Sequence, residues 1–201
     1  MPSEPWYETV NADQPITQGD LIFNCPILSW KSENLGIQGS NENEVLKGAI
    51  DAISADVVVM TQACDLEHEK VTNVILCPQI SLSEYHSFWE KDMESKGHSP
   101  TTKAWKNHCN DICDGYLWNL SMLNEQKSSG NIEMEIQLVD FHEVFTIPRA
   151  FLESFLAQRG EHRYRLLPPY REHLSQAFAR FFMRVGLPIP IEKEWSVLKN
   201  I

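Results

Sequence analysis

The chain has 201 residues, of which 42% are hydrophobic, and this is enough for one globular domain with its own core. Its 28 acidic and 17 basic side chains leave a net charge of −11, which disfavours RNA, DNA and anionic membrane surfaces as partners. Since no apolar run reaches about 20 residues, no signal-peptide pattern opens the chain and five cysteines follow no disulfide spacing, we expect a cytoplasmic protein that neither binds a membrane nor needs a cofactor.

Apolar segments in the first half of the chain predict several strands. The segment 19–28, G-D-L-I-F-N-C-P-I-L, suits a strand with Pro26 at its end or edge. Val57–Met60 and Val71–Cys77 are short continuous apolar runs, which are typical of strands buried on both faces. Their close spacing predicts a hairpin whose loop is A-C-D-L-E-H-E-K. For residues 45–53 we expect a strand in preference to a short helix.

A helical pattern begins at Ser81. The segment S-L-S-E pairs Ser81 with Glu84 in a capping box, and aromatic residues then recur at helical spacing. Ser99 as a cap and Pro100 in the first turn predict the start of a second helix. We expect these two helices to form an insertion of about residues 81–124 between strands.

The second half of the chain alternates between strand and helix patterns. Ile132–Leu138 shows the period-2 alternation of a strand with one wet face. A helix is bracketed by Pro148 and Gly160, and a short strand over Tyr164–Leu167 follows. The clearest helix covers Pro169–Val185 and carries one apolar stripe. Without repeats or long linkers, residues 1–201 are expected to form a single α+β domain.

The order of these segments invites a comparison with a known family. G-D-L-I from Gly19, a proline soon after it, D-V-V-V-M-T, and then V-I-L-C-P-Q-I-S resemble the opening of the MazF/PemK-like toxins, small β-barrels that cut RNA. The resemblance covers roughly residues 19–81. It implies a small, mostly antiparallel, Src-homology-like β-barrel, here with a helical insertion and a packed C-terminal helix. It also implies a bacterial toxin–antitoxin or phage-defence setting.

The same resemblance implies a nuclease site made of an arginine before the V-V-V strand and a serine or threonine after the next strand. Ser81 stands at the second position, but residues 54–56 are Ser-Ala-Asp where the arginine is expected. A carboxylate there would repel the phosphate instead of stabilising its transition-state charge. The resemblance therefore implies a chain that has lost the cutting chemistry, unless an arginine of the C-terminal helix such as Arg171 replaces the missing group.

The segment T-Q-A-C-D, residues 61–65, is the most site-like element. In one interpretation Cys64 is a nucleophile or thiolate ligand beside Asp65, with His68 or His142 as base or second ligand, since a thiol needs a nearby imidazole or cation to ionise near neutrality. In the other, which we favour, Cys64 is a small buried hydrophobe and Asp65 is a turn residue.

Other candidate residues also have two interpretations. Asp140 and His142 would share one face of a strand and supply acid–base chemistry, or form an ordinary surface hydrogen bond. Cys109 and Cys113 lie one helical turn apart, as metal ligands would, but core-facing thiols explain the spacing equally. The segment Arg159–Arg184 holds six arginines and no lysine, which suits either a local basic strip or a solvated helix face.

Four aromatic residues fall in termini or predicted loops, and such residues often anchor protein interfaces: Trp6, Tyr7, Trp30 and Trp195. Our first hypothesis is therefore a non-enzymatic protein-interaction module that binds another protein. The alternatives are an endoribonuclease that uses Ser81 with a substitute arginine, and a hydrolase or metal site centred on Cys64.

Overall fold

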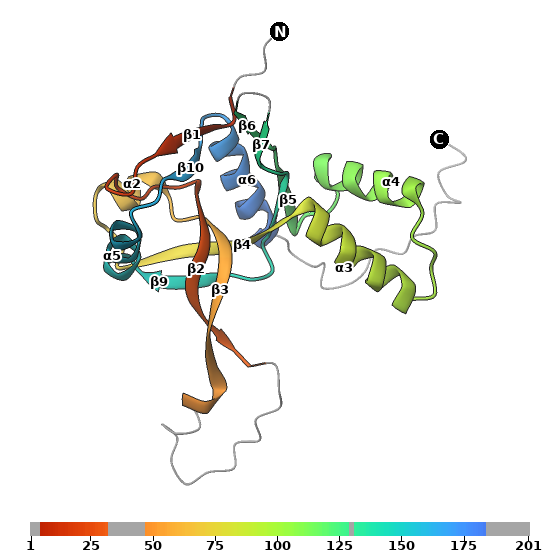
Figure 1. Ribbon diagram of the computed structural model, residues 1–201, viewed down its shortest axis with the longest axis horizontal. Helices are drawn as coiled ribbons and strands as arrows, with labels where there is room; N and C mark the ends of the chain where they lie inside the picture. Colours follow the sequence, from red (N-terminus) through yellow and green to blue (C-terminus); the bar gives the residue numbers. More distant parts are fainter. Residues whose placement is uncertain (1–4, 32–46, 129–130, 184–201) are drawn as a thin grey trace, which may run out of the picture.

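A computed structural model describes residues 5–31, 47–128 and 131–183 and shows a mixed α+β protein with a mostly antiparallel sheet (Figure 1). The strands are β1 (Tyr7–Val10), β2 (Asp20–Trp30), β3 (Ile50–Val59), β4 (Asn73–Ser81), β5 (Leu120–Leu123), β6 (Gln126–Ser128), β7 (Asn131–Met134), β8 (Gln137–Asp140), β9 (Phe145–Pro148) and β10 (Arg163–Leu166). The helices are α2 (Ala63–Glu67), α3 (Leu82–Ser95), α4 (Thr102–Cys113), α5 (Arg149–Arg159) and α6 (Tyr170–Phe182).

The main sheet follows the strand order β1-β10-β2-β3-β4-β8-β5, and β9 also pairs with β4. Strands β8 and β9 lie one after the other against β4, with β8 at Gln79–Ser81 and β9 at Asn73–Leu76. Within the described residues β1 and β5 end the path without pairing to each other, so the closed barrel expected from the sequence is not observed. The sheet stays open because β5 pairs with β8 and carries the path away from β10.

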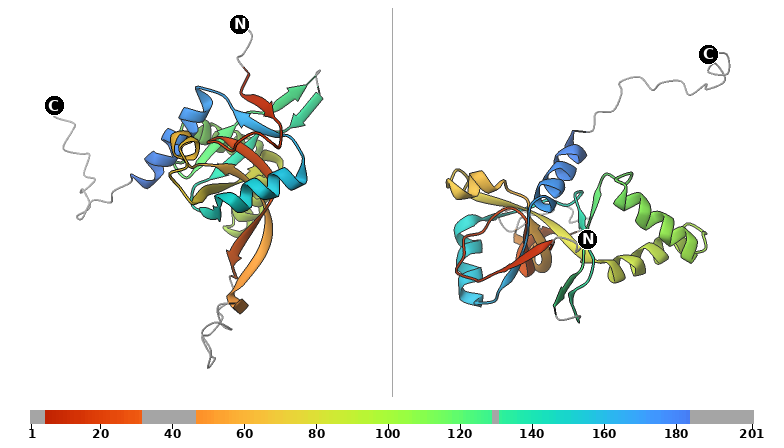
Figure 2. Two further views of the ribbon diagram at one scale, coloured as in Figure 1. Left: turned by 90° about the vertical axis from the view of Figure 1, so that its left-hand side faces the viewer. Right: turned by 90° about the horizontal axis from the view of Figure 1, so that it is seen from above.

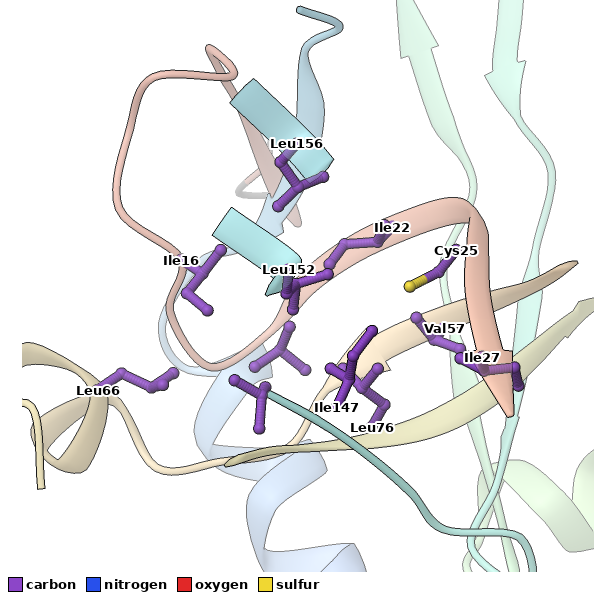
Figure 3. Close-up of a cluster of buried hydrophobic side chains, with 12 residues drawn as sticks. Ile16, Ile22, Cys25, Ile27, Val57, Leu66, Leu76, Ile147, Leu152 and Leu156 are labelled. Carbon is purple, nitrogen blue, oxygen red and sulfur yellow. The ribbon is translucent and has the colours of Figure 1, made fainter. Parts of the chain in front are cut away.

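The core lies on both faces of the sheet, as the continuous apolar runs predicted. On β3, Val57 and Val59 belong to one buried cluster and Val58 to another, because successive side chains point to opposite faces. Figure 3 shows the first cluster, where side chains of β2, β3, β4 and β9 gather with Leu152 and Leu156 of α5. The second cluster includes Leu174 of α6, so helices cover both faces.

The helical insertion follows β4 as predicted. Ser81 caps α3, since its hydroxyl accepts a hydrogen bond from the backbone N–H of Glu84 at 3.2 Å. The predicted start of the second helix is wrong by two residues. Thr101 caps α4 by accepting from the N–H of Ala104 at 3.2 Å, which leaves Pro100 before the cap instead of in the first turn. Helices α3 and α4 form a hairpin that projects from the side of the sheet (Figure 1).

Three further sequence predictions need correction. The single strand expected over Ile132–Leu138 is divided between β7, which pairs with β6, and β8, which pairs with β4 and β5. Alternation marks a pleat but does not say which strand will pair with it. Lys47–Ala49 are helical and β3 starts only at Ile50. Helix α6 ends at Phe182, before the predicted end at Val185, and residues 184–201 lie outside the described part of the chain.

Strands β2 and β3 continue past the rest of the sheet as a two-stranded ribbon, which we call the β2–β3 arm (residues 25–30 and 50–55; Figures 1 and 2). The arm begins at a β-bulge between Ile22 and Cys25, where Asn24 has a left-handed φ of 51°. The carboxylate of Asp56 accepts a hydrogen bond from the N–H of Asn24 at 2.7 Å and so stabilises the bulge. A bulge bends the strand, and here it marks where the arm leaves the sheet.

Candidate functional site

The predicted site residues lie at separate places in the fold. At one end of β4, the N–H of Ile75 donates to the hydroxyl of Thr61 at 2.7 Å, which places the T-Q-A-C-D segment at that end. Ser81 is the last residue of the same strand. Six residues of strand correspond to about 20 Å, because a strand rises about 3.3 Å per residue. Cys64 and Ser81 therefore belong to no common site.

Ser81 and Arg171 are each engaged in local contacts. The Ser81 hydroxyl caps α3 and lies 3.1 Å from the hydroxyl of Ser83, and no guanidinium contacts it among the described residues. The Nη2 atom of Arg171 donates to Oε1 of Glu172 at 2.6 Å. The Arg171 side chain also packs against Gly19, where an added Cβ atom would lie 3.2 Å from Arg171 Cγ. The hydroxyl and guanidinium of the endoribonuclease hypothesis are therefore not brought together.

Cys64 lies in the short helix α2, within the predicted hairpin loop, and its thiol is exposed instead of buried. Its Sγ lies 3.8 Å from both Oε1 of Gln62 and Oδ1 of Asp65. Asp65 in turn forms a 3.9 Å ion pair with Lys70. The described contacts of Cys64 thus include an amide and a carboxylate but not the imidazole that a cysteine nucleophile needs.

Asp140 and His142 are in contact, but for a different reason from the one expected. Oδ1 of Asp140 accepts from the backbone N–H of His142 at 2.9 Å and lies 3.2 Å from its Nδ1. These residues stand where the chain leaves β8, so an aspartate turn, and not strand alternation, joins them. The exposed His142 ring packs on the edge of Phe181, with ring centroids 5.2 Å apart. The pair is a surface hydrogen bond far along the chain from Cys64.

The arginine-rich segment does not form a continuous basic strip in the described residues. Arg163 and Arg165 both bind the buried carboxylate of Asp20, which the sequence analysis missed. Nη2 of Arg180 donates to the carbonyl of Gly115 at 2.8 Å, and its guanidinium lies over the ring of Trp118. A charged residue at the head of a buried strand, as in G-D-L-I, was the signal that could have revealed the Asp20 pair.

The two cysteines of α4 are positioned for packing. Burial raises the pKa of both Cys109 and Cys113, which opposes the thiolate that a metal requires. The Sγ of Cys113 lies 3.5 Å from the Sδ of Met122. Across residues 5–31, 47–128 and 131–183, no group of three or more His, Cys, Asp or Glu side chains is placed to hold a metal ion.

A cleft of about 510 Å³ lies between α4, β5 and α6. Ile112, Leu120 and Met122 contribute apolar lining, and His173, Gln176 and Arg180 add polar groups from α6. Because the guanidinium of Arg180 is held by Gly115, part of this polar rim serves to join α6 to the end of α4. The cleft brings together none of the predicted catalytic residues.

The β2–β3 arm carries the most exposed apolar strand surface among the described residues. Leu28 and Trp30 are 69% and 68% exposed. They lie opposite Ala52 and Ile50 in the register, and directly paired residues share one face of a ribbon. One face of the arm is therefore apolar and open. Trp30 was singled out from the sequence as a loop aromatic, but it belongs to a strand.

No protein-family model matches the chain, and a search of curated proteins finds no match either. No helix in the described residues combines the length and apolarity needed to cross a membrane. Function is therefore argued from geometry alone.

Proposed function

We propose that the chain is a non-enzymatic protein-interaction module and that the β2–β3 arm is its docking surface. The observation that carries this proposal is the exposure of Leu28 and Trp30 on a ribbon that extends past the sheet (Figure 2). An isolated two-stranded ribbon is only marginally stable in water, and exposed aromatic side chains are frequent anchors of protein interfaces. A bound protein would cover the apolar face and add the missing packing.

Two further observations support an interaction module over an enzyme. The candidate catalytic residues Ser81, Cys64 and His142 lie apart, and each has a local structural contact. The arginines that would attract RNA bind protein carboxylates and carbonyls, as Arg163 does with Asp20. With a net charge of −11, the protein would repel a phosphate backbone at long range.

We also propose that the strands β10-β2-β3-β4-β9 are an open form of the Src-homology-like barrel of the MazF/PemK-like toxins. Their order in the sheet and the position of α5 between β9 and β10 support this assignment. In this proposal α3, α4 and β5 to β8 are an insertion between two barrel strands. The interaction would then belong to a cytoplasmic complex of a bacterial toxin–antitoxin or phage-defence system.

The test is co-purification from cells that express the full chain with its native genomic neighbours. Replacing both Leu28 and Trp30 with serine is expected to abolish recovery of the bound protein. The matched control is Phe151→Ser, because Phe151 is also half-exposed but lies on α5. Equal urea midpoints for the variants would show that folding is unaffected.

Incubation with a mixed-sequence single-stranded RNA without metal completes the test. The proposal expects intact RNA. Robust cleavage that Ser81→Ala or Arg171→Ala abolishes would reject the interaction module in favour of the endoribonuclease.

A further inference from the structure

The hydrogen-bond pattern of the β2–β3 arm shows which backbone groups point outward. The N–H of Lys31 donates to the carbonyl of Ala49 at 2.9 Å, so this pair is hydrogen-bonded across the ribbon. In an antiparallel pair, bonded and non-bonded residues alternate. The residues of β3 whose N–H and C=O groups point away from β2 are therefore Ile50, Ala52 and Ser54.

The outer edge of β2 is protected against further pairing. Pro26 faces Ser54 in a non-bonded pair, so the position where an outward N–H would lie has none. The outward carbonyl of Trp30 lies 3.5 Å from the hydroxyl of Ser29, which donates to it. Both features are devices that natural sheets use to block an exposed edge.

The base of the same edge is also occupied. The carbonyl of Phe23 accepts a hydrogen bond from Nη1 of Arg159, and the N–H of Asn24 donates to the carboxylate of Asp56. Strand β10 pairs with β2 only at Asp20 and Leu21. The β2 edge thus has a side chain or a proline at most of its outward positions.

The outer edge of β3 lacks this protection in the described residues. Strand β4 pairs with β3 only at Val57, Val58 and Val59, which leaves the edge from Ile50 to Ser54 open. It contains no proline and no recorded side-chain hydrogen bond to its outward groups. Its outward residues share a face with Leu28 and Trp30, so the open edge and the apolar face are adjacent.

We propose that the bound protein adds an extended strand to the β3 edge at Ile50–Ser54; this inference rests on the proposed interaction module. Outward N–H and C=O groups require an extended backbone as their partner, and strand addition supplies one. On the apolar face, the added strand would place β-branched or other apolar side chains beside Ile50 and Ala52. On the opposite face, it would meet Asp51.

Charge indicates that the added strand is cationic and comes from a different protein. Asp51 forms a 3.3 Å ion pair with Lys31, but its side chain is still half-exposed. The whole chain carries −11, which attracts a basic partner and opposes a second copy of the same charge. The added strand therefore alternates apolar residues with lysine or arginine.

The experiment uses the full chain, labelled with ¹⁵N, and three capped peptides of about eight residues. The first alternates valine with lysine, the second valine with glutamate, and the third is the lysine peptide with every second amide N-methylated. The lysine peptide is expected to slow amide exchange of Ile50, Ala52 and Ser54 at least about tenfold and to leave Leu28 unchanged. The other two peptides are expected to leave all of these amides unchanged.

Two substitutions at one position separate backbone pairing from charge attraction. Ala52→Pro removes an N–H that does not bind β2 and is expected to weaken binding of the lysine peptide at least about tenfold. Ala52→Val keeps that N–H and is expected to retain binding.

Equal binding of the N-methylated peptide, or protection of Leu28 instead of Ala52, would overturn strand addition. Protection of the β3 amides without peptide, rising with protein concentration, would assign the edge to a second copy and also overturn it. If Ala52→Pro keeps the co-purified protein that the Leu28 and Trp30 serine variant loses, strand addition fails and the interaction module stands.

Discussion

Asp20 and Arg163 form a 2.7 Å salt bridge that is almost completely shielded from solvent, with 0% and 4% of their side chains exposed. Arg165 binds the other oxygen of the same carboxylate at 2.5 Å. The remaining N–H groups of Arg163 donate to the carbonyls of Asn11, Gln14 and Pro15. One buried carboxylate therefore connects β2, β10 and the loop before β2.

Asp20→Asn is expected to lower the free energy of unfolding by about 3–5 kcal/mol, because it leaves two buried guanidinium groups without their counter-charge. Urea denaturation measures the change. The exposed Asp13 provides the control, since Asp13→Asn is expected to change stability by no more than about 0.5 kcal/mol. Equal, small effects of both substitutions would show that the buried pair does not hold the loop.

Gly115→Ala is expected to weaken the junction between α4 and α6. Gly115 has a φ of 73°, and an added Cβ atom would lie 2.7 Å from Nη2 of Arg180. Gly97 has a similar φ of 75° but open space around it, so Gly97→Ala reports backbone strain alone. We expect about 1–2 kcal/mol of destabilisation for Gly97→Ala and clearly more for Gly115→Ala, measured by thermal unfolding. Equal losses would mean that the Arg180 contact contributes nothing.

Stability is expected to fall in mild acid because of His108. Its Nε2 lies 2.9 Å from the Tyr85 hydroxyl, and burial lowers the histidine pKa below its ordinary 6.5, against the opposing charge of Asp111. The unfolded state then binds the proton first, so stability is unaffected above about pH 7.5 and decreases as the pH falls below 6.5.

His108→Gln removes this titration. Urea midpoints at about pH 7.5 and about pH 5.5 should therefore differ less in the variant than in the original chain. An equal acid loss in both would show that His108 does not carry it.

Thiol labelling is expected to rank the cysteines by exposure. Burial raises the pKa of Cys25 to about 11, against the opposing charge of Arg159, and that of Cys77 to about 12, with a further contribution from Asp140. With iodoacetamide at about pH 8, mass spectrometry should find Cys64 alkylated first and Cys25 and Cys77 protected until the protein unfolds.

Cys64 is expected to react at the rate of an ordinary exposed thiol. Alkylation more than about tenfold faster than that of N-acetylcysteine would instead support the Cys64-centred site.

Local patterns in the sequence predicted the elements that local physics controls. Continuous apolar residues at Val57–Met60 identified a strand buried on both faces, and Ser81 with Glu84 identified the start of α3. The cap of α4 was placed wrongly because Ser99 and Thr101 are both good capping residues, and only the folded chain shows which hydroxyl meets an N–H.

The site residues were less predictable because their environment comes from distant parts of the chain. Cys64 was expected to be buried, but the hairpin loop folds into α2 and exposes it. Asp140 and His142 are in contact through a turn that alternation did not predict.

The sequence by itself determined the class of the fold, the helix caps and the excess of negative charge, because these depend on residue types and on contacts within a few positions. Only the tertiary structure decided that Asp20 meets Arg163, 143 positions away, that the sheet stays open, and that one edge of the arm is blocked while the other is free. Strand pairing joins segments far apart in the chain, so the groups left unpaired are known only when every strand has found its neighbour.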